Sequence, residues 1–238
     1  MAGLYRTNYF FIRRLHSLLG IIPVGAFFIV HMLLNSRALQ SREAYQWVPD
    51  TLDQVPFILL IEIAFILAPI VFHAILGAVI IYQGDINVSQ PYRGWYENWG
   101  YLFQRITGVL LGVMLTIHLI QTLFVHWGMK ARGEHDFDIY AMMQAIVYDN
   151  PIWWIIYFLF VLVAAYHFGN GVFNFTYKWG LTTSKLSMRW AIAMGLLVGA
   201  LGLFLGAASL CGFQFAKHAA PEAAVAAQHA EADADSGH

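Results

Sequence analysis

Five long apolar stretches constrain this chain more than any other feature of its sequence. A helix needs about 20 apolar residues to cross the roughly 30 Å hydrocarbon layer of a membrane. Five stretches reach that length: 15–34, 57–82, 106–127, 152–177 and 190–213. Only 11% of the 238 residues are charged and 59% are hydrophobic, far from the balance of a soluble domain. The sequence therefore predicts an all-α integral membrane bundle of five transmembrane helices.

Basic residues predict the orientation of this bundle, because lysine and arginine are retained on the cytoplasmic side of a membrane. With the N-terminus inside, the inner segments hold eight of the thirteen Lys and Arg residues: Arg6, Arg13, Arg14, Arg93, Arg105, Lys178, Lys185 and Arg189. We therefore expect a cytoplasmic N-terminus and an outer C-terminus. After a five-helix domain over 1–215, residues 216–238 are rich in alanine and acidic, without apolar periodicity, and predict a disordered tail.

The residues available for chemistry exclude several classes of function. Cys211 is the single cysteine, so the chain forms no intramolecular disulfide and holds no iron–sulfur cluster of its own, which needs about four thiolates. A C-x-x-C-H haem attachment motif and a G-x-G-x-x-G dinucleotide fingerprint are absent from the sequence. The formal net charge is −1 and no block of Lys and Arg occurs, which gives no reason to propose nucleic-acid binding.

Each of the first four apolar stretches carries one histidine at membrane depth: His31, His73, His118 and His167. An ionisable side chain in hydrocarbon is costly unless a partner satisfies it, and is therefore a candidate functional residue. A single such histidine is explained by a hydrogen bond between helices. Four of them on four successive helices favour a common role as ligands.

Depth sorts these four histidines into two pairs. At 1.5 Å of rise per residue, His73 lies about 18 Å from Asp85 and His167 about 16 Å from Lys178, both residues at inner helix ends. By the same rise, His31 lies about 26 Å from Arg14 and His118 about 20 Å from Arg105, which places these two further out. Two stacked pairs of imidazoles match the axial ligation of two b-type haems, which suits electron transfer.

Residues around the histidines are consistent with this interpretation. Gly20, Gly77 and Gly171 offer room for a porphyrin, although close helix packing explains them equally well. Close packing is also the expectation for Gly108 and Gly112 and for the glycines of the last stretch, Gly195, Gly199, Gly202 and Gly206. Haem propionates need cations or hydrogen-bond donors at the inner edge. The candidates there are Arg14, His16, Ser17, Arg105 and Arg189, and for each arginine the alternative is a lipid headgroup anchor.

Five motifs together resemble the di-haem cytochrome b membrane-anchor subunit of bacterial succinate dehydrogenases and fumarate reductases, the cytochrome b558 type. These motifs are "FFIRRLHSLLG", "HMLLN", "FHAILG", "RITGVLLGVMLTIHL" and "AAYHFGNGVFNF". The resemblance implies that His31 and His118 bind a distal haem and that His73 and His167 bind a proximal haem. His16 matches a histidine of the family that is not a ligand.

The resemblance also implies partners and a mechanism. A flavoprotein subunit and an iron–sulfur subunit dock on the cytoplasmic face of a bacterial inner membrane. Electrons pass from the iron–sulfur subunit through the two haems to a membrane quinone, menaquinone in members of this shape. The chain by itself does not oxidise succinate and contributes the quinone site to a succinate dehydrogenase (quinone) complex.

Glu62 is the one carboxylate that lies well inside an apolar stretch, near its outer end. It is a candidate proton carrier at an outer quinone site, and the alternative is a carboxylate that reaches the membrane interface. Three other functions stay open at this point. They are the di-haem cytochrome b anchor of a membrane hydrogenase or formate dehydrogenase, a histidine-lined transporter, and an anchor without haem. A transporter predicts internal repeats and broken helices, and the sequence shows neither.

Overall fold

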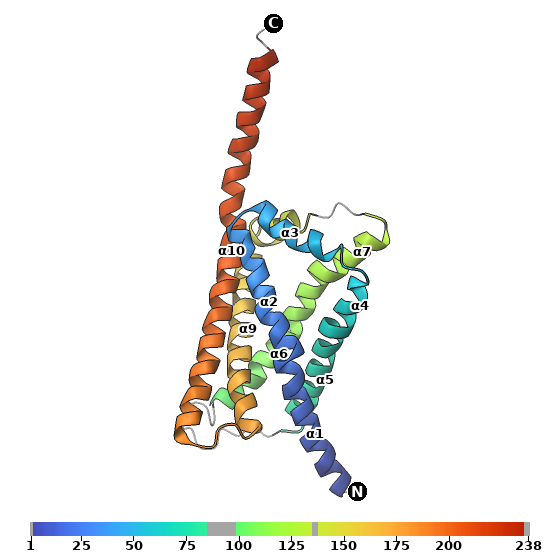
Figure 1. The fold of residues 1–238 in the computed structure, drawn as a ribbon, viewed down its shortest axis with the longest axis vertical. Helices are drawn as coiled ribbons and strands as arrows, with labels where there is room; N and C mark the ends of the chain where they lie inside the picture. The colour runs from blue at the N-terminus through green and yellow to red at the C-terminus, as the bar shows by residue number, and fades with distance from the viewer. Residues whose placement is uncertain (1, 85–98, 135–137, 236–238) are drawn as a thin grey trace.

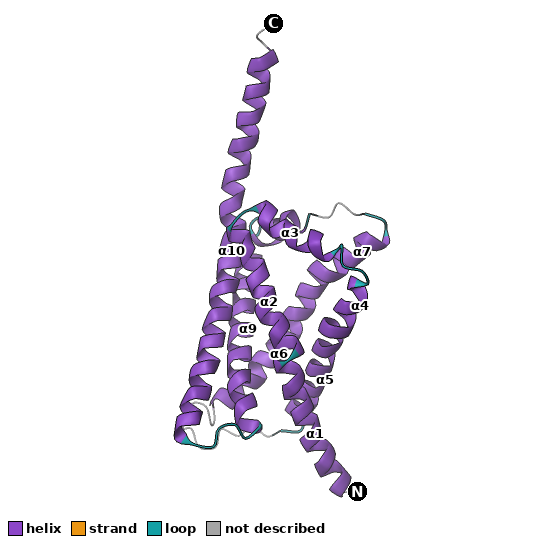
Figure 2. Cartoon of the chain, viewed as in Figure 1, coloured by secondary structure: helices purple, strands orange, loops and turns teal. Residues whose placement is uncertain are grey.

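The computed structural model describes residues 2–84, 99–134 and 138–235, with side chains over 10–214 of these ranges. The described residues form helices, turns and loops without a strand (Figure 2). Five helices are long and apolar enough to span a membrane, which confirms the predicted all-α bundle: Phe10–Leu39, Ile58–Tyr82, Trp99–Ala131, Pro151–Lys178 and Lys185–Gln214. Asp85 and Arg93, used above for depth and orientation, lie outside the described residues, as does the side chain of Arg6.

The first spanning helix consists of α1 (Ala2–Ile21) and α2 (Pro23–Asn35), continued by the short turn η1 (Ser36–Leu39). The interruption comes from Pro23, which has no backbone N–H to donate to the preceding turn. Hydrogen bonds on either side keep the helical register: Ile22 N–H donates to the Leu18 carbonyl (2.9 Å) and Ala26 N–H to the Ile22 carbonyl (3.2 Å). The chain therefore crosses as one helix.

The second and third spanning helices each contain one π-helical turn. The second helix runs through α4 (Ile58–Glu62), η2 (Ile63–Leu67) and α5 (Ala68–Tyr82). The third runs through α6 (Trp99–Leu119), η3 (Ile120–Phe124) and α7 (Val125–Ala131). Each π turn changes the direction of the side chains that follow it, and such turns often occur at functional sites. Here η2 begins directly after Glu62, and η3 begins two residues after His118.

Two short helices without a predicted counterpart cover the end of the bundle opposite the N-terminus, which is the outer end in the predicted orientation (Figure 1). They are α3 (Arg42–Leu52) and α8 (Ile139–Val147), joined by an ion pair between Arg42 and Asp138. Asp138 also caps α8, since its Oδ1 accepts a hydrogen bond from Ala141 N–H (2.8 Å). The main hydrophobic core includes side chains of both short helices and of the bundle beneath them: Ala38, Tyr45, Tyr140, Met143, Val147, Tyr157, Val161, Leu210 and Phe213.

The fourth and fifth spanning helices, α9 (Pro151–Lys178) and α10 (Lys185–Asp235), pack backbone to backbone. A Cβ atom added to Gly195 would lie 2.5 Å from the Gly169 carbonyl oxygen, and one added to Gly199 would lie 3.1 Å from the Ala165 carbonyl oxygen. We call Gly169, Gly195 and Gly199 the glycine seam. Close packing, predicted for the glycines of the last stretch, is confirmed.

The helix α10 continues past the bundle to Asp235, through residues predicted to form a disordered tail (Figure 1). This difference has a simple cause, because alanine has the highest helix propensity and dominates the stretch. The N-terminus and the end of α10 lie at opposite ends of the molecule (Figure 1).

Candidate functional site

The structure brings His31 and His118 together. His31 lies on α2 and His118 on α6, and their ring centroids are 6.0 Å apart with an interplanar angle of 75°. His118 Nδ1 lies 3.4 Å from the hydroxyl oxygen of Tyr157, a buried residue of α9. The Tyr157 hydroxyl donates to Gln121 Oε1 (3.0 Å), so its oxygen accepts from His118. We call His31 and His118 the outer pair.

His73 and His167 form the second pair, which we call the inner pair. His73 lies on α5 and His167 on α9, and their ring centroids are 6.3 Å apart with an interplanar angle of 89°. His16 of α1 stacks on His73, with centroids 4.0 Å apart and an angle of 15°. Two hydrogen bonds of 3.0 Å link these two residues, since each ring Nδ1–H donates to the backbone carbonyl of the other. No motif in the sequence predicts this reciprocal contact.

Both spacings lie in the range of an edge-to-face contact between two rings, and both also match one metal ion held between them. Two imidazoles that bind one metal ion from opposite sides, with metal–nitrogen bonds of about 2 Å, have centroids about 6 Å apart. Three or more metal-binding side chains do not gather anywhere in the described part of the chain. The histidines therefore occur in the described residues as two pairs.

Glycines from neighbouring helices lie against the inner histidines. A Cβ atom at Gly20 would be 2.5 Å from His73 Cε1, and one at Gly108 would be 3.2 Å from His167 Cε1. A Cβ atom at Gly77 would be 3.1 Å from His16 Cε1. These glycines therefore make room for imidazoles. Gly112 differs from the packing expectation, because a Cβ atom there would meet no described atom within 4 Å.

The candidate propionate contacts do not all gather at one place. The Arg14 guanidinium lies 5.1 Å from the Trp179 ring, and Trp179 Nε1–H donates to Ser17 Oγ (3.0 Å). Arg105 stacks over the Tyr101 ring (4.4 Å) and donates to the Gly84 carbonyl (3.3 Å). Arg189 is exposed at the start of α10, the spanning helix that carries none of the four paired histidines.

Glu62 lies at the opposite end of the bundle from these arginines. Its Oε2 accepts a hydrogen bond from Trp127 Nε1–H (2.9 Å), which links the second spanning helix to α7. Asp53, the C-cap residue of α3, forms ion pairs with two residues of α7, Lys130 and His126, and His126 Nε2 is 3.4 Å from Asp53 Oδ1. Glu62 is partly buried and bonded to an indole, so it has a defined position and does not point freely into lipid.

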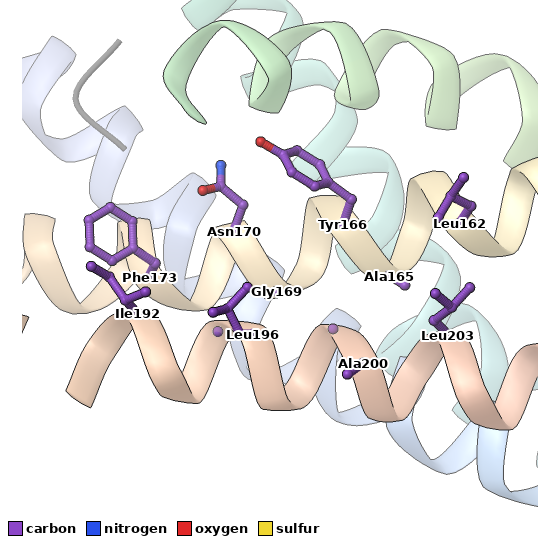
Figure 3. A pocket seen from close by; sticks show the side chains of 12 residues that line it. Leu162, Ala165, Tyr166, Gly169, Asn170, Phe173, Ile192, Leu196, Ala200 and Leu203 are labelled. Atoms are coloured by element: carbon purple, nitrogen blue, oxygen red, sulfur yellow. The ribbon is translucent and has the colours of Figure 1, made fainter. Parts of the chain in front are cut away.

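A groove of about 310 Å³ lies between α9 and α10, beside the glycine seam (Figure 3). Its walls are mainly apolar, with Leu162 and Phe173 on α9 and Leu196 and Leu203 on α10. Figure 3 shows Tyr166 and Asn170 pointing from α9 away from α10. None of the paired histidines lines this groove, which is therefore separate from the two pairs.

Comparison with known proteins identifies the family to which this chain belongs. Residues 87–207 match a family model described as "Succinate dehydrogenase/Fumarate reductase transmembrane subunit". The chain is 32% identical over 189 residues to the succinate dehydrogenase cytochrome b558 subunit of Bacillus subtilis (strain 168). That alignment covers 79% of this chain and 89% of the relative. The chain therefore belongs to the succinate dehydrogenase/fumarate reductase transmembrane subunit family, as a multi-pass membrane protein.

Proposed function

We propose that this chain carries electrons from an iron–sulfur subunit through two b haems to a membrane quinone, within a succinate:quinone oxidoreductase. The observation that carries the proposal is the pairing of four intramembrane histidines, with ring centroids 6.0 and 6.3 Å apart. In this proposal the outer pair holds the distal haem and the inner pair holds the proximal haem. Bound haem would supply reversible one-electron transfer at its iron.

The residues present fit such a group. Imidazole is an axial ligand of b-type haem, and ligating histidines commonly donate their second ring N–H to a nearby acceptor. His73 Nδ1–H donates to the His16 carbonyl, and His118 Nδ1 lies 3.4 Å from Tyr157 Oη. Both arrangements leave Nε2 available to a metal. The glycines beside the inner pair leave room for the two imidazoles between neighbouring helices.

Arg14, Ser17 and Arg105 are the proposed partners of haem propionates at the inner edge. Cations and hydroxyl donors stabilise carboxylates through charge-assisted hydrogen bonds. Arg14 and Ser17 are linked through Trp179, and Arg105 is oriented by Tyr101 and the Gly84 carbonyl. His16 contributes by supporting His73. Arg189 suits a lipid headgroup better, because it is exposed.

Glu62 is proposed to exchange protons with quinone at the outer end. Reduction of a quinone to a quinol takes up two protons, and a carboxylate held near the membrane boundary accepts and donates them. Its bond to Trp127 fixes the carboxylate between the second and third spanning helices. The π turns η2 and η3 lie at this level, which is consistent with a functional site. By family likeness we propose menaquinone as the quinone.

The proposed orientation places the N-terminus and the end that carries Arg14 and Arg105 in the cytoplasm. The retention of Lys and Arg on the inner side supports it. A flavoprotein subunit and an iron–sulfur subunit would then dock on this face, next to the inner pair. The proximal haem is thereby the one nearer to the electron donor.

A haem assay on the purified chain with its copurifying subunits tests the proposal. We expect a pyridine haemochrome assay to give two b haems per chain, and succinate to reduce haem in the intact complex. A preparation without haem would contradict the electron-transfer function. Two haems that hydrogen or formate reduces, and succinate does not, would favour the anchor of a hydrogenase or formate dehydrogenase.

A further inference from the structure

A chain of buried polar side chains leads across α6 and α9 to His167. Among the described residues, the buried polar side chains are Thr107, Asn170 and Ser209, and the first two belong to this chain. Burying a hydroxyl or an amide costs free energy unless it is hydrogen-bonded. Two such hydrogen-bonded groups near one histidine therefore indicate that the protein fixes the position of this side chain.

The direction of each hydrogen bond follows from one backbone carbonyl. Asn170 approaches the Gly100 carbonyl oxygen to 2.9 Å, and a carbonyl only accepts, so Asn170 presents its NH₂ group there. The same NH₂ group donates to Gln104 at 2.6 Å, so Gln104 presents its oxygen to Asn170. The NH₂ group of Gln104 consequently faces His167.

This direction determines which ring nitrogen of His167 carries the proton. The Gln104 NH₂ group lies 3.3 Å from His167 Nε2, which must accept and therefore carries no proton. The proton of the neutral ring is then on Nδ1, 3.1 Å from Thr107 Oγ1. The Thr107 hydroxyl donates to the Phe103 carbonyl (2.6 Å), which leaves its oxygen to accept from Nδ1–H. Every link in the chain agrees with this assignment.

We propose that Thr107 is a positioning residue for the proximal haem. It holds His167 in the Nδ1–H tautomer and fixes the ring so that Nε2 presents its lone pair to iron. Gly108 supports the other side of the ring, since a Cβ atom there would lie 3.2 Å from His167 Cε1. Gln104 keeps a second acceptor in the His167 carbonyl (3.1 Å), so its amide stays satisfied when Nε2 binds a metal. The inference rests on the proposed function.

The contact has a consequence for redox chemistry. Donation of Nδ1–H to an oxygen raises the electron density on the imidazole, and a more basic axial ligand stabilises ferric iron. The Thr107 contact therefore lowers the midpoint potential of one haem. His73 makes a comparable contact, but its Nδ1–H donates to the backbone carbonyl of His16, and no substitution removes a backbone carbonyl. The contact of His167 is made by the Thr107 side chain, so a substitution at this position can remove it.

The experiment compares three variants of the whole complex: Thr107→Val, Thr107→Ser and Thr116→Val. Valine keeps the shape of threonine and removes the hydroxyl, whereas serine keeps the hydroxyl. Thr116 is the matched control, because it lies on α6, is exposed, and donates to the Gly112 carbonyl of its own helix (2.6 Å). The measurements are optical redox titration of both haems and the low-field EPR signal of each ferric haem.

We expect Thr107→Val to raise the midpoint potential of one haem and to shift its EPR signal, with the other haem unchanged. Thr107→Ser and Thr116→Val should keep both wild-type potentials. Loss of one haem in Thr107→Val, with both retained in Thr107→Ser, would also support the role of the hydroxyl.

Three results would overturn the inference. They are an unchanged or lowered potential in Thr107→Val, an equal shift of both haems, and loss of haem in Thr107→Ser as well as in Thr107→Val. Wild-type complex without haem would instead contradict the proposed function. If the wild type holds two haems, a negative result for Thr107 does not contradict the proposed electron-transfer function.

Discussion

The two sides of the bundle are held together differently. In the most apolar windows of the spans formed by α9 and α10, 22% of the residues are buried, against 6%, 6% and 0% in the first three spans. The glycine seam brings the backbones of α9 and α10 into contact. Three of the four paired histidines lie on the other side, where helices make few buried protein contacts.

This difference shows how a membrane bundle divides stability from function. Helices in lipid associate mainly through close packing of small residues, because lipid is as apolar as the side chains it would replace. The seam supplies such packing between α9 and α10. On the histidine side, apolar side chains remain exposed, and a porphyrin between paired imidazoles would contact them. The seam is thus expected to govern stability, and the histidine side to govern redox function.

Removal of a histidine ligand should have the largest effect. We expect His73→Ala to lose one of two haems and to reduce succinate-dependent quinone reduction to background, with the chain still in the membrane. The measurement is haem content per chain together with quinone reductase activity. His126→Ala is the control for haem content, since His126 pairs with Asp53 away from both pairs. Two haems in His73→Ala would show that the inner pair is not a ligand pair.

Loss of the Glu62 carboxylate should slow quinone chemistry without changing the haems. A positioned acid or base contributes about 10²–10⁴-fold to a rate, so Glu62→Gln should lower quinone reduction by about 100-fold or more. Haem spectra should stay as in the wild type. Glu43→Gln removes an exposed carboxylate of α3 and serves as the control. Wild-type turnover in Glu62→Gln would leave this residue a structural partner of Trp127.

A side chain in the glycine seam should destabilise the other side of the molecule. A Cβ atom at Gly195 would lie 2.5 Å from the Gly169 carbonyl oxygen, and overpacking costs about 1–3 kcal/mol. Gly195→Val is therefore expected to lower the thermal unfolding midpoint in detergent, measured by circular dichroism. Ala193→Val is the control, because Ala193 is exposed on the same helix. Equal midpoints for the two variants would mean that the seam does not determine stability.

Periodicity and depth in the sequence were sufficient to predict the five spans and the partners within each histidine pair. Both depend on quantities that the chain fixes locally, namely apolar length and rise per residue. The same reasoning does not tell which helix face meets which neighbour. The stacking of His16 on His73 was therefore missed, and so was the contact of Gly20 with the His73 ring.

Other features depend on contacts between segments far apart in the sequence. The π turns insert a residue where two helices adjust to one another, and no local pattern marks them. Thr107 looks like an ordinary residue in an apolar helix until His167 is placed 60 positions away beside it. For α8, a weak signal existed, since Asp138 is a residue type that commonly caps a helix.

The smallest expected effect concerns Tyr45, which joins the two sides at the outer end. Its hydroxyl donates to Asn35 Oδ1 (3.0 Å) at the end of α2, and the Asn35 carbonyl accepts from Ser209 Oγ of α10 (2.9 Å). A buried hydrogen bond of this kind contributes about 1 kcal/mol, so Tyr45→Phe should lower the unfolding midpoint slightly. If Tyr45→Phe lowers the unfolding midpoint as much as Gly195→Val does, this contact is the main stabilising link between the two sides.

The pH dependence of this variant makes the test sharper. Burial raises the pKa of Tyr45 above its usual value of about 10. The unfolded chain therefore ionises first, and wild-type stability should fall as the pH rises above about 10. Tyr45→Phe should reduce this loss of stability at alkaline pH but not abolish it, because burial also raises the pKa of Tyr140. Tyr82→Phe, at an exposed position, should keep the full alkaline loss. An identical alkaline profile in Tyr45→Phe would mean that Tyr45 ionises as readily in the folded chain as in the unfolded one, and that the outer contact between the two sides is open to water.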